Sequence, residues 1–139
     1  MAQLEQASAV TDKRRRLWRA YHEAFEDFEL AGLVRRPIVP DYCTANTHIY
    51  YLLVRDLAAR TDLLQALNAI GIGAVFHYVP LHSSPAGRRF GRAAGELPVT
   101  VDISERLVRL PLWTGMNDRQ LESVIGAITG WAARVGGLV

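Results

Sequence analysis

The first third of the chain repeats apolar positions with the period of an α-helix. Four apolar residues follow one another at spacings of four, four and three and therefore share one helical face: Leu17, Tyr21, Phe25 and Phe28. Gly32 predicts the end of this helix, because glycine is favoured just past a helix C-terminus. Pro37 and Pro40 exclude further helix and predict a connecting loop.

Three short apolar runs follow this loop and predict strands. Residues 49–54 (IYYLLV) are rich in β-branched and aromatic side chains. Residues 74–78 (AVFHY) predict a second strand, which Pro80 stops. Residues 107–113 predict a third strand, and Pro111 places it at the edge of a sheet because proline cannot donate a ladder hydrogen bond.

Two further helical patterns complete the predicted fold. Residues 61–70 predict a helix with Thr61 as its N-cap and Gly71 as its terminator. Asn117 or Asp118 is expected to cap a last helix that runs to about residue 134. This order of elements predicts an α/β fold: a two-layer sandwich in which a small, three-stranded, largely antiparallel sheet packs on helices.

The segment between the second and third predicted strands carries no strong periodicity. It spans residues 81–101 and contains several glycines and prolines. A stretch of this length is more often a binding loop than a structural connector. We therefore expect a binding loop here.

Length and composition indicate one globular domain, residues 1–139, with half of its residues hydrophobic and 22% charged. The net charge of +2 is too small for a dedicated nucleic-acid-binding protein. The basic run at residues 13–16, followed by Trp18 and Arg19, leaves open a nucleic-acid or acidic-membrane patch, with a solvated helix face as the more ordinary explanation. We expect a cytoplasmic protein. The sequence has a single cysteine, no recognisable signal peptide and no apolar stretch of membrane-spanning length.

The densest cluster of candidate chemistry lies at residues 77–82. His77 and Tyr78 come where the second predicted strand ends, and Pro80 restricts the backbone before His82. Strand ends followed by rigid loops are where α/β domains build binding sites, so these residues are candidates for one. The alternative is that His77 is a satisfied, partly buried histidine and His82 an ordinary surface residue.

Other kinds of site have weaker support. Arg88, Arg89 and Arg92 could bind an anion, because adjacent arginines can clamp phosphates, although a solvated basic turn is the alternative. The candidate ligands for a metal ion lack a recognisable metal-site spacing, which argues against a metal site: His48, His77, His82 and Cys43. No phosphate-binding loop, GxGxxG or nucleophile elbow occurs, so we assign no catalytic residue.

Several strings between residues 46 and 112 resemble the C-terminal region of the sugar aminotransferases grouped as DegT/DnrJ/EryC1/StrS. The resemblance rests on residues 46–51 (NTHIYY), 71–82 (GIGAVFHYVPLH), 83–87 (SSPAG) and 104–112 (SERLVRLPL). It implies the small domain of the aspartate-aminotransferase fold, in a homodimeric enzyme that moves an amino group from glutamate to the 4-keto carbon of a dTDP-linked sugar. It further implies that the small domain closes over the active site and that its HYxPLH loop lies beside the nucleotide sugar. On this resemblance we assign substrate binding to His77, Tyr78, His82 and Arg88.

The chain departs from this family in one essential respect. In the family, a large N-terminal domain supplies the lysine that binds pyridoxal phosphate (PLP), and no part of this sequence resembles that domain. Lys13 is the only lysine and lies in a basic run on a helix. We therefore expect a truncated aminotransferase that binds no cofactor by itself and is inactive alone. The alternative is a stand-alone module that binds a nucleotide sugar or another protein without catalysis.

Overall fold

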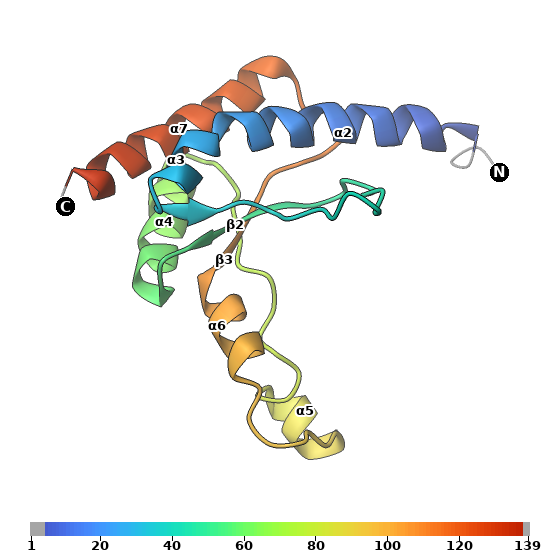
Figure 1. Ribbon diagram of the computed structural model, residues 1–139, viewed down its shortest axis with the longest axis vertical. Coiled ribbons are helices and arrows are strands. Elements are labelled where there is room, and N and C mark those ends of the chain that lie inside the picture. Colours follow the sequence, from blue (N-terminus) through green and yellow to red (C-terminus); the bar gives the residue numbers. More distant parts are fainter. Residues whose placement is uncertain (1–4, 138–139) are drawn as a thin grey trace.

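Three antiparallel strands lie at the centre of the fold, and an arm of two short helices leads away from them (Figure 1). The computed structural model describes residues 5–137. In chain order the elements are α2 (Ala7–Ala24), α3 (Glu26–Leu30), β1 (Val34–Arg35), β2 (Tyr50–Val54), α4 (Leu57–Ala69), α5 (Pro85–Phe90), α6 (Pro98–Arg106), β3 (Leu107–Leu110) and α7 (Asp118–Gly136). The strands are ordered β1-β2-β3, and both pairs are antiparallel. The predicted α/β class with a small antiparallel sheet is confirmed.

One face of the sheet forms the hydrophobic core with α2, α4 and α7. Its main members are Leu17, Tyr21, Phe25, Tyr50, Leu52, Val54, Leu63, Leu67, Val108, Leu110, Leu121, Val124 and Ile128. Because strand side chains alternate between faces, the residues between these core positions lie on the opposite side. There Tyr51, Leu107 and Arg109 stay partly exposed, so this open face of the sheet is available for a site.

The first helix is interrupted at Phe25, which separates α2 from α3. Gly32 ends α3 as the sequence predicts, with a positive φ of 71°. Its N–H donates to the Glu29 carbonyl, and the N–H of Leu33 donates to the Phe28 carbonyl, both at 2.9 Å. These two bonds form a Schellman C-cap, which requires the left-handed backbone that glycine adopts without strain.

The sheet differs from the prediction in one strand. Residues 74–78 were expected to form the second strand, but only Val75 pairs, in an isolated bridge to Arg109. Antiparallel pairing beyond Val75 would set residue 77 opposite Leu107 at the start of β3, but the segment leaves the sheet after this single bridge. The third strand is instead the short β1, which the sequence pattern did not indicate. The edge position predicted for β3 is confirmed, although it ends at Leu110, before Pro111.

Side-chain caps set where two of the helices begin. α4 starts at Leu57 rather than at Thr61, because the carboxylate of Asp56 accepts a hydrogen bond from the Ala59 N–H at 2.8 Å. The predicted N-cap of α7 is confirmed at Asn117. Its amide oxygen accepts from the Gln120 N–H at 2.9 Å, and the Gln120 side chain accepts from the Asn117 N–H at 3.0 Å.

The segment expected to be a loop, residues 81–101, contains helical structure. Ser84 caps α5 by accepting a hydrogen bond from the Gly87 N–H, and Pro85 occupies the first turn. α6 begins at Pro98, and together α5 and α6 form the arm that projects from the sheet (Figure 1). Within residues 5–137, no helix has both the length and the apolar character needed to cross a membrane.

Candidate functional site

His77 and Tyr78 lie together on the surface, just after the bridge at Val75. Their rings meet edge to face, with centroids 4.8 Å apart and an interplanar angle of 70°. Tyr78 is 70% exposed, and His77 is also exposed. No side-chain hydrogen bond to another described residue is recorded for either ring, so both can bind a ligand.

A shallow outer hollow surrounds this pair. It is lined by Val75, Phe76, His77, Tyr78, Val79, Leu81 and Arg109. Phe76 helps to hold the segment in place, because the Arg60 guanidinium lies 5.4 Å from the centre of its ring. Arg60 also donates to the Ser104 carbonyl of α6 at 2.7 Å, so one side chain links α4, α6 and the segment before His77.

A second, sheet-face hollow of about 330 Å³ lies on the open face of the sheet. Its lining comes from the strands, from α2 and from the loop between β1 and β2: Trp18, Pro37, Ile38, Val39, Ala45, Asn46, Thr47, His48, Ile49, Tyr51, His77, Leu107 and Arg109. His77 and Arg109 line both hollows. The two hollows therefore form one candidate site with these side chains at their junction.

Thr47 is a strained residue in the wall of the sheet-face hollow. It is only 7% exposed and has a positive φ of 52°, which β-branched residues rarely adopt. Its hydroxyl is buried without a hydrogen-bond partner among the described residues. Backbone strain of this kind persists where the surrounding structure fixes it, and it concentrates at functional sites.

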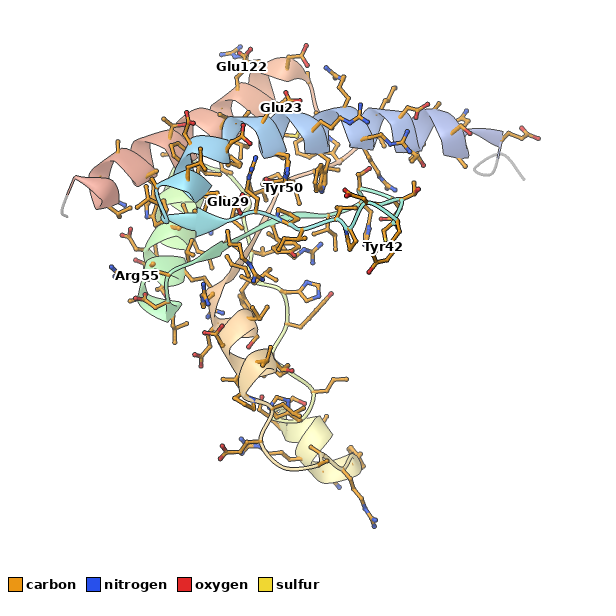
Figure 2. All side chains as sticks on the ribbon, viewed as in Figure 1. Glu23, Glu29, Tyr42, Tyr50, Arg55 and Glu122 are labelled. Carbon is orange, nitrogen blue, oxygen red and sulfur yellow. The ribbon has the colours of Figure 1, made fainter. Side chains whose placement is uncertain are left out.

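The loop that carries Thr47 is anchored at its start by Arg36. The Arg36 guanidinium donates to Glu29 at 2.7 Å, to Glu26 at 3.2 Å and to the His22 carbonyl. These contacts hold the pKa of Glu29 below its ordinary value. Figure 2 shows Glu29 near β1 and Tyr50 beneath α2.

An aromatic cluster beside this anchor has unusual electrostatics. His22 stacks on Trp18 at a centroid distance of 4.6 Å and meets Tyr50 edge to face. Burial, with the Arg36 cation as a further cause, lowers the pKa of His22, while burial raises the pKa of Tyr50. The ring nitrogen Nδ1 of His22 and the hydroxyl of Tyr50 are both buried without a hydrogen-bond partner among the described residues.

The other two predicted site residues, His82 and Arg88, lie in a different hollow. This arm hollow also includes Ala86, Phe90, Leu97 and Thr100. The structure thus brings His77 to Tyr78 and His82 to Arg88, with Leu81 lining both the outer hollow and the arm hollow. Arg88 is fully on the surface of α5, and the guanidinium of Arg89 lies 5.0 Å from the ring centre of Phe90.

The weaker alternatives gain little from the structure. Within residues 5–137, no group of three or more His, Cys, Asp or Glu side chains could hold a metal ion. His48 hydrogen-bonds to the neighbouring Asn46 instead. In the basic run on α2, Arg15 pairs with Asp12 at 3.0 Å and Arg16 with Asp118 at 2.8 Å, as on a solvated helix face.

Sequence reasoning missed two residues of the candidate site, Arg109 and Thr47. The alternation of residues 107–110 carried a signal for Arg109, because it sets this cation on the face opposite Val108 and Leu110. Thr47 had no such signal, since its backbone conformation depends on the loop around it.

Comparison with known proteins gives a consistent picture. A sequence model of the DegT/DnrJ/EryC1/StrS aminotransferase family matches residues 1–129. The chain is 31% identical to protein MJ1066 of Methanocaldococcus jannaschii over 130 residues and 28% identical to the spore coat polysaccharide biosynthesis protein SpsC of Bacillus subtilis over 131. Each match covers 91% of this chain and 33% of the relative.

Among solved structures, a DegT DnrJ EryC1 StrS aminotransferase from Brucella abortus is similar, with a TM-score of 0.79 and 27% identity. That match covers 94% of this chain and 33% of the Brucella chain. The chain thus spans about a third of the length of the relatives that it matches.

The described residues do not fit the PLP used by aminotransferases of this kind. The cofactor needs a lysine amine in its pocket. Lys13 is the only lysine, is exposed on α2 and lines neither the outer nor the sheet-face hollow.

Proposed function

Because this chain belongs to the DegT/DnrJ/EryC1/StrS aminotransferase family, we propose that it is the small C-terminal domain of a PLP-dependent sugar aminotransferase. Residues 1–139 form one domain in this proposal, and the cofactor-binding large domain corresponds to the two thirds of the relatives that the chain does not match. When bound in that domain, the cofactor carries the amino group between substrates.

The reaction that we propose for the complete enzyme moves an amino group from glutamate to the 4-keto carbon of a dTDP-linked sugar. Within the family, we propose a dTDP-4-amino-4,6-dideoxygalactose transaminase, on the resemblance of the strings at residues 71–82 and 104–112. A place in polysaccharide biosynthesis accords with the similarity to the spore coat polysaccharide biosynthesis protein of Bacillus subtilis. We propose a cytoplasmic homo-oligomer for the complete enzyme.

The exposed pair His77 and Tyr78 is the observation that carries the proposed binding role. Both rings border a hollow without recorded side-chain partners, so the imidazole and phenol are free to hydrogen-bond with sugar hydroxyls. Phe76, held by Arg60, keeps the backbone before them in place. Preorganisation of this kind lowers the entropy lost when a ligand binds.

His82 and Arg88 would serve a second part of the same substrate. They line the arm hollow, which meets the outer hollow at Leu81. A guanidinium binds a diphosphate through two parallel hydrogen bonds, so Arg88 on the exposed arm suits the charged end of a nucleotide sugar.

Half-reactions of the complete enzyme would test this role. His77→Ala should slow the reaction with the sugar nucleotide more than the reaction with glutamate, because glutamate has no sugar for this pair to hold. Single-turnover absorbance changes of the cofactor measure each half separately. Equal losses in both halves would show that His77 is a packing residue.

The two exposed tyrosines provide a matched control. Tyr78→Phe should weaken sugar-nucleotide binding, since it removes a hydroxyl at the outer hollow. Tyr42→Phe should have no effect, because Tyr42 is 90% exposed at the tip of the loop between β1 and β2 (Figure 2). Equal effects of the two substitutions would remove the support for a site at Tyr78.

A stand-alone binding module is the second candidate function. The observation that favours it is that the outer hollow and the sheet-face hollow are both present in this chain, while no lysine lines either of them. Adding a lysine-bearing large domain separates the two candidates. Aminotransfer that depends on both parts would support the enzyme domain, and nucleotide-sugar binding that persists without aminotransfer would support the module.

A further inference from the structure

Arg109 occupies the junction of the outer and sheet-face hollows, next to His77. Its N–H donates to the Val75 carbonyl at 2.7 Å and its carbonyl accepts from the Val75 N–H at 3.2 Å. On its other side it is paired with Tyr51 of β2. Backbone pairing on both sides fixes where the Arg109 side chain leaves the sheet, on the same face as Tyr51.

The guanidinium of Arg109 differs from those of three other partly buried arginines near the sheet. Arg36, Arg60 and Arg106 all donate hydrogen bonds to carbonyl or carboxylate oxygens of the chain. No hydrogen bond or ion pair from the Arg109 side chain to another described residue is recorded. A guanidinium has five donors and no acceptor, so a ligand oxyanion is the group that would satisfy it.

Arg109 is also better placed than Arg88 to act with His77. Arg109 and His77 line the same two hollows, whereas Arg88 lines the arm hollow with His82. Two-sided backbone pairing positions Arg109 on the sheet, while Arg88 lies on a six-residue helix at the end of the arm.

We propose that Arg109 binds a substrate oxyanion, either a phosphate of the nucleotide sugar that His77 and Tyr78 hold or a carboxylate of the amino donor, and thereby helps to determine which substrates the site accepts. This inference rests on the proposed function of that site. The sheet-face hollow of about 330 Å³ lies at the lower end of the range for small-molecule sites. It suits one charged end of a substrate rather than a whole nucleotide sugar.

Arginine side-chain NMR of the 139-residue protein tests the proposal directly. Inorganic pyrophosphate and glutamate are titrated separately while the Nε–H resonance of Arg109 is followed. We expect a saturable shift with one of them, and at least about tenfold weaker binding in Arg109→Gln, because the charged bidentate contact is lost. Arg119→Gln is the matched control and should bind as the parent does, because Arg119 is exposed on α7 and lines none of the three hollows.

The two probes distinguish the sources of the oxyanion. Saturation by pyrophosphate assigns Arg109 to a phosphate of the nucleotide, and saturation by glutamate assigns it to a carboxylate of the amino donor. Binding that is unchanged in Arg109→Gln, or weakened as much in Arg119→Gln, overturns the proposal. Saturation by neither probe up to roughly 50 mM, where binding would be worth less than about 2 kcal/mol, also overturns it.

Two further measurements keep the result interpretable. If Arg109→Gln fails to fold, Arg109→Lys keeps the charge without the planar fork and should bind several-fold more weakly than the parent; equal binding overturns the proposal. A titration with a dTDP-sugar reports on His77 and Tyr78. Failure of the sugar to shift those two rings, with the Arg109 response intact, refutes the proposed function and leaves the oxyanion site standing.

Discussion

Removing one hydroxyl from each of two neighbouring buried tyrosines should change stability in opposite directions. Tyr21 and Tyr50 are both 0% exposed, and their ring centroids lie 5.2 Å apart in the same aromatic cluster. The Tyr21 hydroxyl donates to the Pro111 carbonyl at 2.8 Å. The Tyr50 hydroxyl is buried without any hydrogen-bond partner among the described residues. Tyr→Phe therefore removes a satisfied group in one case and an unsatisfied one in the other.

The magnitudes follow from what each hydroxyl exchanges for water on folding. Tyr21→Phe loses a net hydrogen bond and should lower the free energy of unfolding by about 1 kcal/mol. Tyr50→Phe loses no bond and removes the desolvation cost of a buried hydroxyl, so it should raise the free energy of unfolding by about 1 kcal/mol. The two variants should thus differ by about 2 kcal/mol, although the chemical change is the same.

Urea unfolding followed by circular dichroism measures both variants against the parent protein. The midpoints should move in opposite directions, and the slope with denaturant should stay constant because the area exposed on unfolding does not change. Destabilisation of similar size in both variants would refute the reasoning, since it would mean that Tyr50 has a partner in solution. A change in slope would mean that the substitution altered the packing of the cluster.

Three further predictions concern other parts of the chain. Because the pKa of His22 is lowered in the fold, the stability that its neutral ring contributes is present above about pH 6.5 and is lost as the pH falls below that value. In His22→Phe the urea midpoint should therefore depend less on pH below about pH 6.5 than it does in the parent protein. An equal dependence on pH in both proteins would contradict the assignment. Gly32→Ala should lower the free energy of unfolding by about 1 kcal/mol, because alanine is strained at the φ of 71° that Gly32 adopts. The space around the new methyl group is open, so a steric clash would not contribute. An unchanged midpoint in thermal unfolding would exclude this backbone strain. Lys13, exposed on α2, should form no specific stoichiometric adduct when the protein is mixed with PLP and reduced with borohydride, and mass spectrometry of a digest would reveal one.

The sequence predicted α2, α4, α7 and the central strand because their signals are local, whereas α5 and α6 lie in a segment expected to be a loop. The spacing of Leu17, Tyr21 and Phe25 marks one helical face wherever the helix packs, and all three are buried. Asn117 caps α7 through atoms only three residues away. The same locality explains why residues 49–54 predicted β2 almost to the residue.

Local sequence signals could not predict the short strand β1, nor that residues 74–78 would fail to form a strand. A two-residue strand is too short to show alternation, and β1 exists because Val34 and Arg35 meet Val54 and Leu53 of β2. Residues 74–78 have the composition of a strand, yet a strand needs a partner along its length. Only Val75 has one, in its bridge to Arg109, and the segment leaves the sheet after it although β3 begins at Leu107.

The candidate site divides in the same way. The sequence by itself singled out His77, Tyr78 and His82 around Pro80 and Arg88 among nearby arginines, and the family resemblance assigned these residues to substrate binding. The tertiary structure decided that these residues fall into two hollows, that Arg109 joins His77 and that Thr47 is strained. Residue type and local spacing are properties of neighbouring positions, whereas the sharing of a hollow depends on contacts between segments that are distant in sequence.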